Sequence, residues 1–280
     1  MNDYEIVITV LILLFAGGWY WEHQRYSRML KMQKEQYTRQ IEELNRKIEE
    51  EYTVKMSDKQ AKISALQSQI NPHFLYNTLE CIRSEALLYE CQSIANMAKA
   101  LAAFFRYSIS KKESIVTIRD ELRNIENYFL IQSYRFENKF TLDIKVQEED
   151  QEVYDYLIPK LSLQPIVENA IFHGLETKPD TGKVTIRAYA TDQRTVVVVS
   201  DNGVGIAPDK LMRMQQALRT SKRVEADRAD ERGNGIALNN VNQRIKLVFG
   251  GEYGLHIYSS EGRGTDIELW LPKTEDKEQL

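Results

Sequence analysis

The sequence predicts an α+β fold, with a helical first half and a mixed sheet in the second. In the first half, apolar residues recur at intervals of three and four, which is the period of an amphipathic helix. After Asn138, segments such as FTLDIKV, KVTIRAYA and GLHIYSS alternate apolar and polar residues as half-buried strands do, and helical segments are interleaved with them. Helices packed on one face of a mixed sheet form an α+β layer architecture.

Composition narrows the classes of protein to which the chain can belong. Because 42% of its 280 residues are apolar, the chain can build an ordinary globular core. The formal net charge of −4 argues against broad electrostatic attraction to nucleic acid, so no nucleic-acid partner is predicted. Cys81 and Cys91 lack metal-ligand spacing and are predicted to be core thiols in a reducing compartment.

The first element is an uncharged apolar segment, IVITVLILLFAGGWYW, at residues 6–21. As a helix it covers about 24 Å, somewhat less than the hydrocarbon core of about 30 Å. A signal peptide and a buried core helix are the alternatives, but the acidic start and the lack of a small-residue cleavage site disfavour the first. We expect a membrane anchor at residues 1–21, in contact with the lipid bilayer through residues 6–21. The basic residues that follow predict a single-pass protein of the cell membrane with the remaining chain in the cytoplasm.

The second element is a heptad-like segment at residues 22–65. Its apolar positions run from Tyr37 to Ile63 at spacings of three and four, with one extra step of four near Tyr52 that indicates a stutter. A solvated amphipathic helix and a parallel dimeric coiled coil both fit this pattern. Continuity with the anchor favours a coiled-coil linker and a homodimer.

The third element is a helical block at residues 66–136 that contains QINPHFLYNTLE, with Pro72 directly before His73. Proline removes one helical hydrogen bond and kinks the helix. Beyond it, the positions that continue the earlier apolar seam are polar, and a new apolar stripe lies on nearly the opposite side. The polar stripe comprises His73, Asn77, Glu80 and Ser84, and the apolar one Leu75, Leu79, Ile82 and Ala86. The change of side predicts an exposed, reactive His73.

The second half carries glycine-bearing elements in three contexts: DNGVGI (201–206), GNGIAL (233–238) and GRGTDI (262–267). Each alone could be a tight turn. Together they predict a phosphate-binding site, since a glycine turn before a helix lets backbone N–H groups approach an anion. Asp201 could accept a hydrogen bond from an adenine amino group.

Upstream, QPIVENAIFHG places Asn169 and His173 one helical turn apart, with Glu168 beside them. An amide oxygen that faces a bound triphosphate is a plausible Mg²⁺ ligand, because Mg²⁺ prefers oxygen and shares its shell with phosphates and water. These residue types fit a bound triphosphate with Mg²⁺, and the resemblance described next implies that the nucleotide is ATP.

The motifs VENAIFHG, DNGVGI, GNGIAL and GRGT resemble the N, G1 and G2 boxes and the closing glycine-threonine element of the GHKL ATP-binding fold, an α/β sandwich. QINPHFLYNTL and FFRYSI resemble the LytS/YesM type of sensor histidine kinase, and the resemblance covers residues 66–272. It implies a helical dimerisation and histidine phosphotransfer domain at 66–136 and an ATP-binding catalytic domain at 137–275.

The resemblance also implies roles for individual residues. His73 would be the phosphoacceptor, Asn169 the Mg²⁺ ligand and Asp201 the adenine partner. Other nucleotide-binding positions would be Glu168, His173, Gly203, Gly205, Gly264 and Thr265, with Gly233 and Gly235 bounding a mobile lid. Two positions depart from related patterns: Pro165 stands where many GHKL ATPases have a water-activating carboxylate, and Phe74 follows His73 where many histidine kinases have an acid. Asn77 and Glu80, on the face of His73, are the candidates to orient the imidazole.

These expectations define a membrane-anchored sensor histidine kinase that phosphorylates itself on His73 and passes the phosphoryl group to an aspartate of a response regulator. The alternative is a phosphatase-dominant or scaffolding regulator that binds ATP and controls a response regulator without strong kinase activity. A nucleotide-hydrolysing machine of the chaperone or topoisomerase kind is disfavoured, because Pro165 replaces the expected base.

Overall fold

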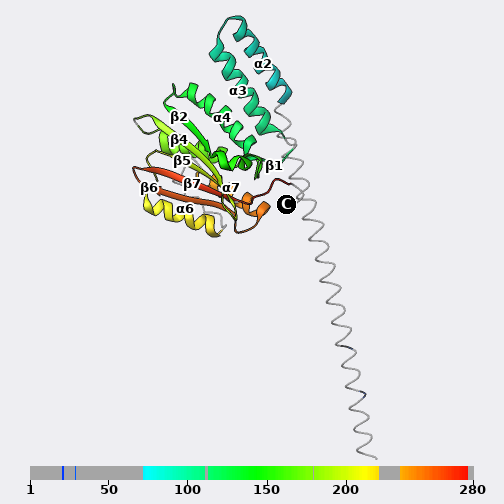
Figure 1. The fold of residues 1–280 in the computed structure, drawn as a ribbon, viewed down its shortest axis with the longest axis vertical. Helices are drawn as coiled ribbons and strands as arrows, with labels where there is room; N and C mark the ends of the chain where they lie inside the picture. The colour runs from blue at the N-terminus through cyan, green and yellow to red at the C-terminus, as the bar shows by residue number, and fades with distance from the viewer. Residues whose placement is uncertain are drawn as a thin grey trace, which may run out of the picture. The chain divides into compact units, whose positions relative to one another are not determined.

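The computed structural model describes residues 72–110, 113–178, 180–220 and 234–276, together with Trp21 and Met29. The second of the chain's two compact units begins at Pro72 and contains every helix and strand discussed below (Figure 1). Apart from Trp21 and Met29, the predicted anchor at 6–21 and the predicted coiled coil at 22–65 lie outside these residues, as does Gly233. Among the described helices, none is both long and apolar enough to cross a membrane.

The unit begins with two helices that pack against each other, α2 (Pro72–Leu88) and α3 (Gln92–Ile109). Leu79 and Ala86 are the buried residues of α2, as predicted for the new apolar stripe, whereas Ile82 is 45% exposed. On α3 the buried residues are all alanines, whose small side chains allow the helices to approach closely (Ala95, Ala98, Ala100 and Ala102). The interpretation of Cys81 and Cys91 as core thiols is wrong: both are exposed, one on the outer side of α2 and one in the turn before α3.

The second half forms a five-stranded sheet in the order β2-β4-β5-β7-β6. The strands are β2 (Phe140–Val146), β4 (Gly182–Ala190), β5 (Thr195–Asp201), β6 (Gly254–Ser260) and β7 (Gly264–Leu271). β2 is parallel to β4, and all the other neighbours are antiparallel. Along β4 the side chains alternate between buried and more exposed, which confirms the period-two prediction. The mixed α/β class is therefore confirmed.

The helices that pack on this sheet are α4 (Ile118–Arg135), α5 (Gln164–Asn169), η2 (Ala170–Leu175), α6 (Pro208–Thr220) and α7 (Asn234–Phe249). A short 3₁₀ segment, η1 (Glu148–Asp155), follows β2. A second, two-stranded sheet pairs β1 (Ile115–Thr117) with β3 (Leu157–Pro159). This pairing fixes the start of α4 against the segment that leads into α5.

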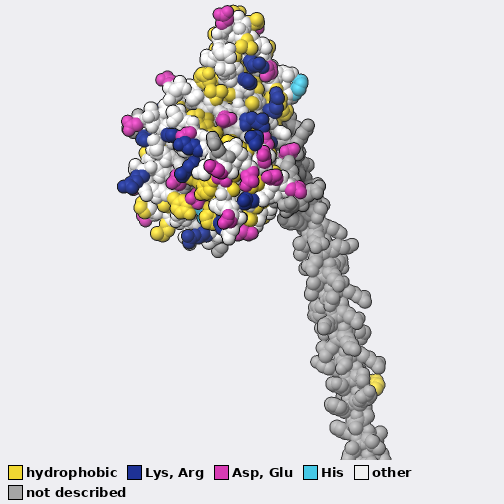
Figure 2. Space-filling model, viewed as in Figure 1, with side chains coloured by type: hydrophobic (Ala, Val, Ile, Leu, Met, Phe, Trp, Pro, Cys, Tyr) yellow, Lys and Arg dark blue, Asp and Glu magenta, His cyan; other side chains and the backbone are white. Residues whose placement is uncertain are grey.

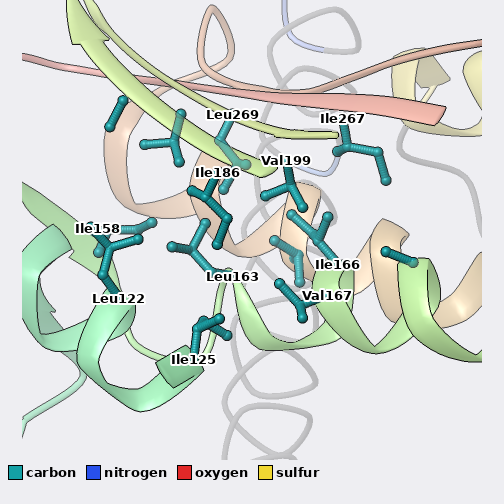
Figure 3. Packing of buried hydrophobic residues seen from close by; sticks show 14 of the residues in the cluster. Leu122, Ile125, Ile158, Leu163, Ile166, Val167, Ile186, Val199, Ile267 and Leu269 are labelled. Carbon is teal, nitrogen blue, oxygen red and sulfur yellow. The ribbon is translucent and has the colours of Figure 1, made fainter. Parts of the chain in front are cut away.

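The main core contains side chains of α4 as well as of the sheet. Figure 3 shows Leu122 and Ile125 of α4 close to Leu163 at the start of α5, with Ile186 and Leu269 projecting from the strands toward them. These side chains are at most 4% exposed. The core therefore continues across residue 136, where the sequence predicts a domain boundary. That boundary stays a prediction.

Charged side chains of both signs are interspersed over the visible face of the described residues, and apolar side chains also reach the surface (Figure 2). Exposed large apolar side chains include Phe74, Leu87 and Leu88 of α2 and Ile94 of α3. The helical pair therefore presents apolar surface in addition to the side that packs internally.

Candidate functional site

A cavity of about 240 Å³ lies between the sheet and helices α5, α6 and α7. Its lining includes predicted site residues from distant parts of the sequence: Asn169, His173, Asp201, Gly205 and Thr265. The ends of β5 and β7 bring Asp201 opposite Thr265, because these two residues are register partners. The fold therefore gathers the motifs that the sequence predicted to act together.

Asp201 ends β5 and places a carboxylate in the wall of the cavity. Its Oδ1 accepts a hydrogen bond from the Gly203 backbone N–H at 2.8 Å. Burial raises the pKa of the Asp201 carboxyl to about 6, although hydrogen bonds from the Gly203 and Thr265 backbone N–H groups oppose the rise. Near neutral pH the side chain is ionised and is a strong acceptor for an N–H donor in the cavity.

The glycines after Asp201 are required by close backbone approaches. A Cβ on Gly203 would lie 2.3 Å from the carbonyl oxygen of Gly174, and the next N–H, of Val204, donates to that oxygen at 2.9 Å. Gly205 has φ of +70°, and a Cβ there would lie 2.1 Å from the oxygen of Ser260. Only glycine fits at both positions, which keeps the turn closely packed at the cavity.

Asn169 ends α5, and His173 follows within the π-helical turn η2. Both line the cavity, as their predicted common face requires. The Asn169 amide nitrogen is buried and has no hydrogen-bond partner among the described residues. Because the oxygen and nitrogen of an amide are assigned from their partners, this amide has unused capacity for a ligand in the cavity.

The chemistry of these side chains fits Mg²⁺ held together with phosphate. Asn169 supplies an amide oxygen, and the described residues contain no cluster of three or more His, Cys, Asp or Glu side chains that could hold a metal. A Mg²⁺ ion bound at Asn169 would therefore draw most of its ligands from nucleotide phosphates and water, which is its usual coordination.

The remaining predicted positions are not among the residues that line the cavity. Glu168 accepts a hydrogen bond from Nε2 of Gln164 at 2.8 Å. Gly264 opens β7 and pairs with Ser260, and Gly235 lies in the first turn of α7. The roles predicted for these residues stay predictions.

Sequence reasoning missed the contribution of α6 to the cavity. Lys210 and Met214 line it together with Ile206, and the apolar side chains of Ile166 and Ile267 complete the wall. A signal was present, because Lys210 and Met214 are four residues apart in a helical segment that directly follows DNGVGI. One face of that helix had to border the glycine turn.

His73 is the second residue of α2 and is exposed, as the change of apolar side predicts. The amide nitrogen of Asn77, one helical turn later, lies 3.2 Å from Nδ1 of His73. Glu80 instead forms an ion pair with Arg83 at 2.7 Å. Of the two predicted orienting residues, Asn77 is the one in contact with the imidazole.

Comparison with known proteins agrees with these two sites. Residues 61–140 match the family model described as Histidine kinase, and residues 159–275 match that described as Histidine kinase-, DNA gyrase B-, and HSP90-like ATPase. The chain is 38% identical over 238 residues to the sensor histidine kinase YesM of Bacillus subtilis (strain 168), covering 84% of this chain and 37% of that protein.

Two further relatives match the chain at similar levels of identity. The sensor protein LytS of Bacillus subtilis (strain 168) is 31% identical, covering 79% of this chain and 35% of the relative. The sensor histidine kinase YpdA of Escherichia coli (strain K12) is 37% identical, covering 76% and 34%. The chain thus spans about a third of the length of these relatives. With its histidine kinase and GHKL-type ATPase domains, the chain belongs to the LytS/YesM type of sensor histidine kinases.

Proposed function

We propose that this protein is an ATP-dependent histidine kinase of a two-component system, which phosphorylates itself on His73 and then phosphorylates an aspartate of a response regulator. The observation that carries the proposal is the cavity that joins Asn169, Asp201 and Thr265. The same chain presents an exposed His73 whose Nδ1 is already in contact with Asn77. A nucleotide site and a reactive imidazole are the two parts that such a reaction needs.

The contact with Asn77 selects the nitrogen that reacts. With its amide turned to present Oδ1, Asn77 accepts a hydrogen bond from Nδ1–H of His73, and Nε2 keeps its lone pair. Nε2 forms a bond to the γ-phosphorus of ATP while the bond from that phosphorus to the β–γ bridging oxygen breaks, and ADP leaves. Because His73 is exposed, its Nδ1 proton can pass to water.

The nucleotide-binding side chains have separate tasks. Asp201 accepts a hydrogen bond from the adenine amino group, and the turn at Gly203 and Gly205 lets the backbone pack closely beside Asp201. Asn169 is the residue that would hold Mg²⁺, which neutralises charge on the phosphates when bound. Thr265 and His173 line the same cavity, and their nucleotide-binding roles belong to the proposal.

The assembly that we propose follows the sequence pattern. Residues 6–21 anchor the protein in the cell membrane with the kinase in the cytoplasm, and residues 22–65 form a parallel coiled coil. The helical phosphotransfer domain at 66–136 then forms a homodimer, and residues 137–275 form the catalytic domain. The exposed apolar side chains of Phe74, Leu88 and Ile94 support the dimer, because such surface is usually covered in an assembly.

Incubation of the full chain with γ-labelled ATP and Mg²⁺ tests the kinase proposal. The wild type should acquire an acid-labile, base-stable label, and His73→Gln should acquire none. His23→Gln is the matched control and should be labelled like the wild type. Label retained by His73→Gln would refute the assignment of the phosphoacceptor. Nucleotide binding without any label on the wild type would refute the kinase proposal itself.

A further inference from the structure

A fully buried carboxylate, that of Glu121 on α4, lies where several elements of the kinase meet. It accepts hydrogen bonds from the backbone N–H groups of Leu161, Ser162 and Leu163 at 2.6, 2.9 and 2.9 Å. It also accepts one from the hydroxyl of Tyr107 on α3. A buried carboxylate with this many donors organises the segments that supply them.

Several hydrogen-bond donors and a positive charge surround the Glu121 carboxylate. Burial raises the pKa of Glu121, whereas the hydrogen bonds from Tyr107 and the backbone oppose the rise. The guanidinium of Arg244, on α7, interacts electrostatically with Glu121 and donates to the carbonyl oxygen of Leu161 at 2.8 Å. The surroundings therefore provide donors and positive charge for the carboxylate.

The segment held by Glu121 determines how the chain enters α5. Leu161 has φ of +60°, which is uncommon for a residue with a side chain. Its N–H is held by Glu121 and its carbonyl oxygen by Arg244, so both sides of this residue are fixed. Leu163, the residue before α5, has no side-chain cap. The carboxylate of Glu121 instead fixes the three residues that lead into the helix, through their backbone N–H groups.

A second contact runs from α4 into α5 toward Asn169. Nδ2 of Asn124 donates to Oε1 of Gln164 at 3.2 Å, and Nε2 of Gln164 donates to Glu168 at 2.8 Å. Glu168 directly precedes Asn169. The same face of α4 thus holds both the entry to α5 and the side chain next to the candidate Mg²⁺ ligand.

Besides Tyr107, a second residue connects the end of α3 to the segment that leads into α5. Nζ of Lys160 donates to the carbonyl oxygen of Ser110, the residue after α3, at 2.7 Å. Nζ of Lys160 also lies 4.8 Å from the centre of the Tyr107 ring. The phosphoacceptor helices α2 and α3 therefore connect to the segment that positions Asn169.

We propose that Glu121 is a positioning residue for phosphoryl transfer, and that Tyr107 links its placement to helix α3. Glu121 sets the path of residues 161–163 and thereby the position of the Asn169 amide at the phosphates. Tyr107 makes that position depend on where the end of α3 lies. The inference rests on the proposed function for its kinetic consequence, but its effect on Mg²⁺-dependent nucleotide binding does not require phosphoryl transfer.

The test compares Glu121→Gln and Tyr107→Phe with the wild type, all as the full chain. Calorimetric titration measures the affinity for AMP-PNP with and without Mg²⁺. Because Asp201 lies on β5 and its carboxylate is held by the backbone N–H of Gly203, metal-free affinity should stay within about twofold, whereas the gain in affinity from Mg²⁺ should fall by about fivefold or more. The kcat of autophosphorylation should fall about tenfold or more, and the KM for ATP in Mg²⁺ should rise by about the same factor as the lost gain in affinity.

Matched controls exist on α4 itself. Tyr128→Phe removes a buried hydroxyl that has no hydrogen-bond partner among the described residues, and Glu126→Gln neutralises an exposed carboxylate. Both should behave as wild type. If Glu121→Gln does not fold, Tyr107→Phe decides the question, because its carboxylate partner keeps the backbone hydrogen bonds.

The binding data separate this inference from the proposed function. If the folded variants gain as much nucleotide affinity from Mg²⁺ as the wild type does, the inference is wrong. An equal loss of affinity with and without Mg²⁺ would also overturn it, because such a loss indicates general damage to the site. A selective loss of the Mg²⁺-dependent gain supports it even if no variant, including the wild type, acquires label.

Discussion

Asp201→Asn is the substitution for which the structure gives a stability effect with a defined sign. Burial raises the pKa of the Asp201 carboxyl from 3.8 to about 6 in the folded protein. A carboxyl with a raised folded pKa binds its proton more tightly when folded. The contribution of the Asp201 carboxyl to the free energy of unfolding of the wild type is therefore greatest at low pH. It decreases as the pH rises from about 4 through about 6, and it does not change further above that range.

The size of the effect follows from the same values. A rise from 3.8 to about 6 corresponds to about 3 kcal/mol at 1.36 kcal/mol per pKa unit. The side chain is only half-buried and solvent screens part of this, so we expect about 2 kcal/mol. Asparagine does not ionise, yet its oxygen can still accept the hydrogen bond from Gly203.

Urea unfolding of the full chain, followed by circular dichroism at a series of pH values, measures this effect. The quantity of interest is the free energy of unfolding of Asp201→Asn minus that of the wild type, because other titrating groups cancel in the difference. This difference should increase by about 2 kcal/mol between about pH 4 and pH 8, so the variant gains stability relative to the wild type as the pH rises. A difference that does not vary with pH would refute the reasoning. Asp192→Asn, an exposed substitution in the turn before β5, is the control for simple loss of charge.

Three other predictions address the two sites. Nucleotide affinity of the wild type, measured by calorimetry, should fall below about pH 6 as Asp201 is protonated, and should be weak and nearly constant with pH in Asp201→Asn. Asn77→Ala should lower the rate of label incorporation about tenfold at unchanged nucleotide affinity, because the contact with Nδ1 of His73 is lost. Gly203→Ala should lower the free energy of unfolding by about 2 kcal/mol or more, because its Cβ would lie 2.3 Å from a backbone oxygen. Gly251→Ala, with no atom within 4 Å of the new Cβ, should be near neutral by thermal unfolding.

The sequence predicted those parts of the molecule in which one residue type is required locally. Gly203 and Gly205 are visible as a motif because backbone approaches of 2.3 and 2.1 Å leave no room for a side chain. The exposed His73 could be predicted because helical periodicity is itself a local property, and Pro72 marks where the apolar stripe changes side. The alternation of the strands predicted the sheet in the same way.

Properties that depend on distant contacts could not be read from the pattern. The spacing of Cys81 and Cys91 does not say which side of a helix will be covered, and both proved exposed. The helical period of α4 suggests an ordinary apolar stripe, but it does not show that Ile125 packs against the start of α5. Tertiary packing decides such questions, and a single sequence does not encode its partners in an obvious form.

Glu121 shows why a residue can be central to the site and still be absent from its motifs. Its backbone partners, Leu161 to Leu163, lie about forty residues later, and any residue type except proline would offer the same N–H groups. No local pattern can therefore mark the pairing. His73 differs, because the nucleophile that we propose must reach a nucleotide on another part of the chain, which requires exposure, and its contact with Asn77 lies within its own helix. The proposed phosphoacceptor is thus recognisable in the sequence, whereas the buried carboxylate that we propose positions Asn169 becomes recognisable only once the fold brings α4 to the start of α5.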